Sequence, residues 1–129
     1  MADGVSVTLA NSWLDALCNA TAYSETTVYA KLHTADPGSA GTTAASAETT
    51  RKALSFAAAS SGAIDLDTTA SWTPWPAPAD GETISDISIW DDPTAGNFLF
   101  SANLASPKTL NTGDTFNLTA CTITFTTAS

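Results

Sequence analysis

Residues 27–38, which read TVYAKLHTADPG, decide what the rest of the chain can be. Apolar and polar side chains alternate over residues 27–34, as they do in a strand with one buried face. The apolar positions are Val28, Ala30 and Leu32, and the positions of the opposite face are Tyr29, Lys31 and His33. A turn is expected next, because Asp36 can accept a hydrogen bond from nearby backbone, Pro37 fixes φ and Gly38 tolerates positive φ.

The balance of charge is strongly acidic, with a net charge of −9 at pH 7 and four basic side chains. Nucleic-acid phosphates need cations to neutralise them, so nucleic-acid binding is not expected. Docking on an anionic membrane is not expected either, and no segment approaches the ~18 apolar residues that span a bilayer. The charge suits solubility, repulsion between free subunits and a basic protein partner.

The two cysteines and the single histidine give no metal site. Cys18 and Cys121 are expected to be free thiols of a reducing compartment, although a disulfide between them stays open. Cysteine together with one histidine cannot supply the four ligands of a structural zinc site. No metal and no cofactor is therefore expected.

Residues 1–8 are polar and are expected to form an N-terminal arm. Residues 9–18 predict the one convincing helix, because four apolar side chains recur at spacings near 3.6. These are Leu9, Trp13, Leu14 and Leu17. A helix of this length is marginal alone in water, so it must pack on the rest of the chain, with Trp13 as its anchor.

The remainder predicts short strands separated by turns and one long loop, residues 35–50, that is rich in Gly, Ser, Thr and Ala. The expected strands cover residues 26–34, 51–59, 64–68, 83–90, 97–104, 106–110 and 115–127. The apolar phase flips within the last strand, which predicts a bulge near Ala120 or a strand that crosses between two sheets. The pattern predicts a single domain, residues 1–129, that is mainly β. We expect a two-sheet antiparallel β-sandwich, Ig-like or jelly-roll-like, with one short N-terminal helix.

Several motifs recur in a fixed order and resemble those of one family. Residues 27–38 are similar to TVYVALHTADPG, and residues 50–56 to a Y-A-R-Q-A-hydrophobic-T-F strand in which Thr50 replaces the aromatic. An aromatic-Pro pair follows at Trp75-Pro76. Residues 81–91 match a Gly-Thr strand of the family but carry Asp86 where a histidine is common, so no role of that histidine carries over. GNFLF at residues 96–100 and KTLNTGDTF at residues 108–116 complete the series.

In these motifs the chain resembles a family of small structural proteins of tailed bacteriophages, often labelled tail-fibre or minor tail proteins. The resemblance covers nearly the whole chain. It implies a non-enzymatic role in the virion, contacts with other virion proteins such as the major capsid protein or tail proteins, and a homo-oligomer. It implies no catalytic residue.

Aromatic side chains among prolines form the candidate interface. Its residues are Trp72, Pro74, Trp75, Pro76 and, on the helix, Trp13. Exposed tryptophans can form a subunit contact or stack on sugar rings. The alternative is that these tryptophans close the end of the sandwich core. The prolines also predict an edge segment, because proline gives no hydrogen bond to a sheet.

Other candidate residues give weaker patterns. His33 is expected to be a plain surface residue at the end of a strand, because a Ser-His-Asp site would require Asp36 and a serine to converge on it. The carboxylate pairs Asp65/Asp67 and Asp91/Asp92 could serve a glycosidase or bind Ca²⁺, but are expected to be solvated. The long loop is either a contact arm that orders on assembly or a flexible linker.

These observations predict a structural protein on the surface of a bacteriophage virion. Small size and the lack of collagen-like or coiled-coil repeats favour a capsid decoration protein. The alternative is a tail-fibre or tail-tip module that faces the host, which is what the labels of the family favour. A third hypothesis is a carbohydrate-binding module, which would need aromatic and carboxylate groups in one groove.

Overall fold

The computed structural model describes residues 4–128, and this part of the chain is mainly β with one N-terminal helix. The elements are β1 (Gly4–Val5), α1 (Val7–Cys18), β2 (Val28–His33), β3 (Lys52–Leu54), β4 (Ala63–Asp65), β5 (Ala70–Trp72), β6 (Glu82–Trp90), β7 (Phe98–Leu110), β8 (Phe116–Leu118) and β9 (Thr122–Thr124).

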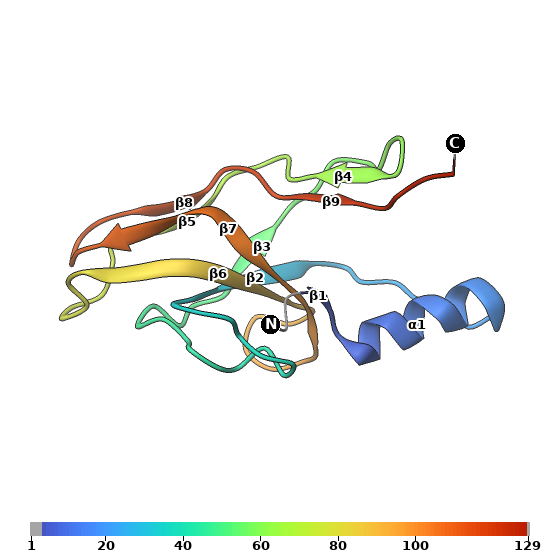
Figure 1. The fold of residues 1–129 in the computed structure, drawn as a ribbon, viewed down its shortest axis with the longest axis horizontal. Coiled ribbons are helices and arrows are strands. Elements are labelled where there is room, and N and C mark those ends of the chain that lie inside the picture. Colours follow the sequence, from blue (N-terminus) through green and yellow to red (C-terminus); the bar gives the residue numbers. More distant parts are fainter. Residues whose placement is uncertain (1–3, 129) are drawn as a thin grey trace.

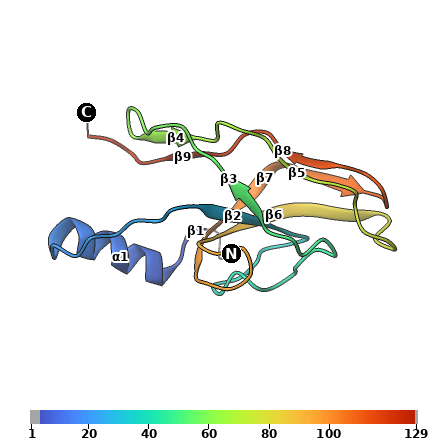
Figure 2. The same cartoon turned by 180° about the vertical axis from the view of Figure 1, so that it is seen from behind.

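The strands form antiparallel sheets in two layers (Figure 1). One layer is a five-stranded sheet with the order β1-β7-β6-β2-β3. The two-stranded sheets β5–β8 and β4–β9 lie end to end in the other layer, and β3 and β7 cross between the layers (Figure 2). The mainly β fold with an N-terminal helix is confirmed, but the type of sandwich, Ig-like or jelly-roll-like, is not.

The opening stretch forms β2, which lies between β6 and β3 in the large sheet. Ala30 and Leu32 are both 0% exposed and belong to the core, as their alternation predicts. His33 of the opposite face is also 0% exposed, so the expectation of a surface histidine is wrong. The long loop covers it: residues 43–46 return beside the end of β2, where Ser46 N donates to Leu32 O at 3.1 Å.

The core lies between the large sheet and β5–β8. Its apolar members come from both layers and include Leu32, Ile84, Ile87, Ile89, Leu99, Leu110, Trp72, Trp75, Phe116 and Leu118. The rings of Trp72 and Phe116 meet edge to face, with centroids 5.7 Å apart. Such pairs add about 0.5–1.5 kcal/mol to the burial of the rings themselves.

A single strand, β7, replaces the two segments expected at residues 97–104 and 106–110. The pairing with β6 jumps between Ile84↔Lys108 and Asp86↔Asn103. Residues 104–107 bulge out of the ladder at this point, and Pro107 is among them. Proline is tolerated at a bulge because no ladder hydrogen bond is lost there, so it does not end the strand.

The last expected strand is divided into β8 and β9. β8 pairs with β5, whereas β9 pairs with β4 in the other small sheet. Residues 119–121 separate the two strands. The predicted crossing between two sheets near Ala120 is therefore confirmed.

The N-terminal arm is shorter than expected. Gly4 and Val5 pair with β7, Ser6 caps the helix by accepting a hydrogen bond from Leu9 N at 3.1 Å, and α1 begins at Val7. Residues 1–3 lie outside the described part. The helix extends beyond the end of the large sheet, on the side of β4–β9 (Figure 1).

Candidate interaction surface

The tryptophans of the candidate interface are divided between core and surface. Trp72 and Trp75 are 0% and 1% exposed, and Trp72 Nε1 donates to Thr50 O at 2.8 Å. They close the core, which was the alternative interpretation. Pro74 is exposed and Pro76 is half-buried, so these prolines reach the surface although the two tryptophans do not.

Trp13 has a different environment. It is half-buried on α1, and its ring meets the ring of Phe125 edge to face, with centroids 5.6 Å apart. Phe125 follows β9, so this contact joins the helix to the opposite layer. Both rings line an apolar cleft of about 330 Å³ between α1 and the β4–β9 sheet, here called the α1 cleft. Its other walls come from Gly4, Val5, Val28, Phe56, Ile64, Phe100 and Ile123.

Large apolar side chains of the N-terminal segment, of α1 and of the C-terminal segment remain in water. They are Val5 (46% exposed), Val7 (77%), Leu14 (60%), Leu17 (80%) and Phe125 (61%), here called the α1 face. Within α1 only Leu9 is fully buried. The expected single core-facing stripe is therefore wrong for Leu14 and Leu17, because the helix projects past the sheet on which it packs.

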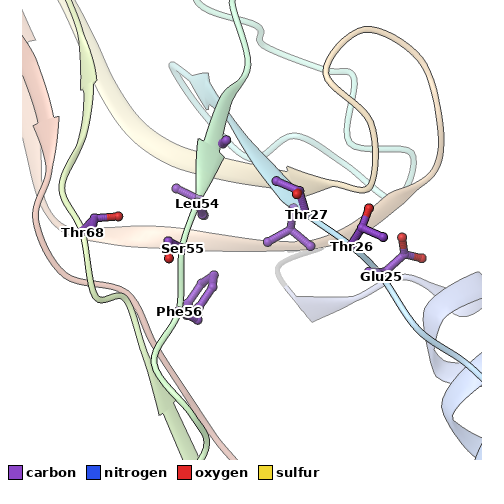
Figure 3. Close-up of a pocket in the computed structure, with 9 residues that line it drawn as sticks. Glu25, Thr26, Thr27, Leu54, Ser55, Phe56 and Thr68 are labelled. Carbon is purple, nitrogen blue, oxygen red and sulfur yellow. The ribbon is translucent and has the colours of Figure 1, made fainter.

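A second, more polar groove opens where β2 and β3 diverge (Figure 3). It encloses about 590 Å³ and is lined by Glu25, Thr26, Thr27, Val28, Ala53, Leu54, Ser55, Phe56 and Thr68. Val28 and Phe56 line the α1 cleft as well, so the two hollows share a wall. Glu25 is the single charged residue of the lining, and it has no carboxylate partner there for acid–base chemistry of the glycosidase type.

The only histidine is part of a buried hydrogen-bond network. Ser88 Oγ lies 2.7 Å from His33 Nε2 and accepts from Trp90 Nε1 at 2.8 Å, while His33 Nδ1 lies 2.8 Å from Thr43 O. The carbonyl can only accept, so Nδ1 carries the proton and Nε2 accepts from the serine.

This pair resembles the serine and histidine of a nucleophilic site, but it cannot act as one. His33 and Ser88 are each 0% exposed, so no substrate reaches them. A backbone carbonyl replaces the orienting carboxylate, and Asp36 bonds instead to Gly38 N in its own turn. Burial lowers the pKa of His33 and keeps the ring neutral. The network is structural, and sequence alone could not pair residues 55 positions apart.

The carboxylates have structural partners: Asp91 and Asp92 stabilise a turn, and Asp65 stabilises a strand pair. Asp91 accepts from the backbone and side-chain nitrogens of Asn97 at 2.6 and 2.8 Å. Asp92 accepts from Thr94 N and Ala95 N, and these hydrogen bonds lower its pKa. Asp65 accepts from the hydroxyl of Thr122 across the β4–β9 pair. No group of three metal-ligating side chains occurs among residues 4–128.

Arg51 holds the hairpin loop, residues 91–97, against the sheet. Its Nη1 donates to Asp92 O at 2.8 Å and to Ala95 O at 2.6 Å, and its guanidinium lies 3.9 Å from the centroid of the Trp90 ring. Basic side chains are scarce in this chain, and this one is used inside the fold. It does not supply a free cation for an anionic ligand.

The cysteines are not bridged. Cys18 is exposed at the end of α1, whereas Cys121 is half-buried and burial raises its pKa. In the part of the chain that the structure describes, no helix has the length and apolar character needed to cross a membrane.

Comparison with known families gives one informative result. A family profile described as podophage GP4 fiber I protein gp80 matches residues 4–126. Comparison with curated proteins gives no match. The profile confirms the resemblance to small bacteriophage structural proteins, and it favours a fibre protein over a capsid decoration protein. Because the match spans almost the whole chain, this protein belongs to the podophage fiber I protein family, a family of bacteriophage virion fibre proteins.

Proposed function

We propose that this chain is a structural module of a phage tail fibre that acts through contacts with other tail or fibre proteins. The family match over residues 4–126 carries the proposal. The small size and the lack of fibre repeats had favoured the capsid. Both features are compatible with a fibre that is assembled from several modules, because a single module needs neither great length nor a repeat.

The surface of the described residues is consistent with a binding role. The buried His33 and Ser88 offer no accessible nucleophile, whereas the α1 face leaves large apolar side chains in water. Exposed apolar patches of this kind are characteristic of protein–protein contact sites. The module therefore has a surface for assembly.

The carbohydrate-binding alternative loses the residues on which it depended. Sugar stacking needs an exposed aromatic face, and Trp72 and Trp75 are both in the core. A glycan array tests what remains of this alternative, and we expect no binding.

Locating the protein on the particle tests the tail-fibre proposal. Gold-labelled antibody on intact virions, combined with mass counting of copies per particle, separates the two placements. We expect few copies, all at the tail. Many copies spread over the shell would instead support the capsid decoration role and refute the proposal.

A further inference from the structure

The polar groove between β2 and β3 interrupts a row of backbone hydrogen bonds. Its two walls are residues 25–28 and residues 53–56, which lie on opposite sides of the opening in Figure 3, and it is here called the split-sheet groove. We propose that the split-sheet groove binds an extended peptide segment of another protein, which enters as an additional strand between the two walls. This site goes beyond the proposed function, and it does not depend on where the protein sits in the virion.

The direction of the Phe56 backbone follows from its neighbours. Ala57 N donates to Asp65 O at 2.9 Å. Asp67 N donates to Ser55 O, also at 2.9 Å. In an antiparallel pair, two such bonds flank a residue whose own N–H and C=O point to the opposite side of the strand. Phe56 is that residue, so its N–H and C=O point into the split-sheet groove.

The opposite wall has a matching unused residue. The pairing of β2 with β3 ends at Val28↔Leu54, and the next hydrogen-bonded pair in this register would be Thr26 with Phe56. The chain bends at Thr26, and the two walls separate there. Within residues 4–128, the backbone groups of Thr26 and Phe56 make no hydrogen bond. A strand placed between the walls could bond to both of them, as peptides do when they extend a sheet.

The side chains of the groove leave room for such a strand and predict its pattern. Ala53 and Ser55 are short and exposed, whereas Val28, Leu54 and Phe56 are buried or half-buried on the interior side. Successive side chains of a strand point to opposite faces. The segment that fits therefore alternates, with apolar side chains toward the interior and small polar ones toward water.

Charge adds a preference at one end of the segment. Glu25 is exposed and is the single charged residue of the lining. The whole chain has a net charge of −9, which attracts basic segments and repels acidic ones. We therefore expect a lysine or arginine in the segment beside Glu25. Added salt should weaken binding, because this charge pair lies at the solvent-exposed rim.

Hydrogen exchange of the free protein tests the geometry without any ligand. The amide of Leu54 belongs to the β2–β3 ladder and should exchange slowly, whereas the amides of Thr26 and Phe56 should exchange at least tenfold faster. A Phe56 amide that is protected as well as that of Leu54 would overturn the proposal, because the groove would then already be closed by hydrogen bonds.

Binding is measured by fluorescence anisotropy with the full chain and a panel of labelled, amidated hexapeptides up to about 1 mM. The peptides alternate valine and threonine and carry lysine, glutamine or glutamate at the first or the last position. We expect saturable binding that is tightest for a lysine at one of the two ends and that weakens between ~0.05 M and ~0.5 M salt. If no peptide of the panel binds, the proposal is wrong.

Methylated peptides distinguish insertion from the addition of a strand to one edge. Methyl groups on every second backbone nitrogen remove the donors that face one wall. Either of the two alternate sets should weaken binding at least tenfold, because an inserted strand bonds on both sides. If one of the sets has no effect, the peptide bonds to a single edge and insertion is refuted.

Protein variants locate the site. Ser55→Trp should abolish binding by filling the groove, and Ser55 does not line the α1 cleft. Ser106→Trp, at an exposed serine of β7, is the matched control and should bind as the parent does. Glu25→Gln should remove the advantage of the lysine peptides over the glutamine peptides. Circular dichroism establishes that each variant is folded.

Binding that survives Ser55→Trp would place the peptide elsewhere and overturn the proposal. The labelling of virions is read separately, so tail placement and peptide binding can fail independently.

Discussion

Replacing Ser88 by alanine is expected to destabilise the protein more than the loss of one oxygen atom suggests. Ser88 Oγ is the centre of the buried network: it accepts from Trp90 Nε1 and donates to His33 Nε2. Alanine leaves both of those atoms without a partner. His33 and Ser88 are 0% exposed and Trp90 is 6% exposed, so bulk water does not replace the lost hydroxyl.

The magnitude follows from the two orphaned groups. A buried polar group that loses its hydrogen-bond partner costs about 1–3 kcal/mol. Two such groups give an expected loss of about 2–6 kcal/mol in the free energy of unfolding. This is a large part of the ~5–15 kcal/mol by which domains are stable. The melting temperature of the variant should therefore be clearly lower than that of the parent protein.

Urea unfolding at pH 7, followed by tryptophan fluorescence and circular dichroism, measures the change. Ser106→Ala is the matched control: the same atom is removed from an exposed serine of the neighbouring strand β7. An exposed site of this kind should change the free energy of unfolding by less than about 0.5 kcal/mol. The slope of free energy against urea should be unchanged in both variants, since neither alters the buried area.

One result would refute this reasoning. If Ser88→Ala and Ser106→Ala unfold within about 0.5 kcal/mol of each other, the network contributes nothing that water or backbone cannot replace. The assignment of His33 as a neutral, buried structural residue would then lose its support.

Three further outcomes are expected. Because burial lowers the pKa of His33 in the folded state, unfolding takes up a proton below about pH 6.5, and stability should fall as pH drops from 6.5 to 5 by at most ~1.4 kcal/mol per pH unit; a His33→Phe variant should not show this slope. Gly41→Ala should cost ~2–4 kcal/mol in the same urea assay, because Gly41 has a φ of +70° and the new Cβ would lie 2.4 Å from Phe98 Cδ2. Gly113→Ala should cost only ~1–2 kcal/mol, because Gly113 has a φ of +88° but no atom near the new Cβ. Equal losses would contradict the packing of the long loop on β7. Arg51→Lys should lower stability by about 1–3 kcal/mol and expose the hairpin loop to limited proteolysis. The lysine side chain is shorter and has no planar group to lie over the Trp90 ring, so it cannot keep the ring contact while it reaches both carbonyls.

The parts of the fold that sequence predicts well are those governed by local alternation. Ala30 and Leu32 are buried as the period of two requires, and the flip of phase near Ala120 marks the place where β8 gives way to β9. Both predictions depend only on the residue types of neighbouring positions. They do not require knowledge of the partner strand.

The predictions that fail depend on partners far away in the sequence. His33 resembles a surface residue until Ser88 and Thr43 are brought to its two ring nitrogens. Pro107 resembles the end of a strand unless the bulge opposite β6 is known. The long loop has a flexible composition, yet Gly41 packs against Phe98 because a glycine leaves room for the ring. In each case the missing information is a long-range contact.

The break between β8 and β9 also explains why an apolar surface is left uncovered. A continuous strand over residues 115–127 would have formed one sheet over the whole core. Instead β8 closes the core with β5, while β9 pairs with β4 and stands over α1, where Trp13 and Phe125 provide a bridge across an otherwise open apolar cleft. In the described chain the core is therefore covered under β5–β8, whereas apolar side chains remain exposed to water beside α1 and β9.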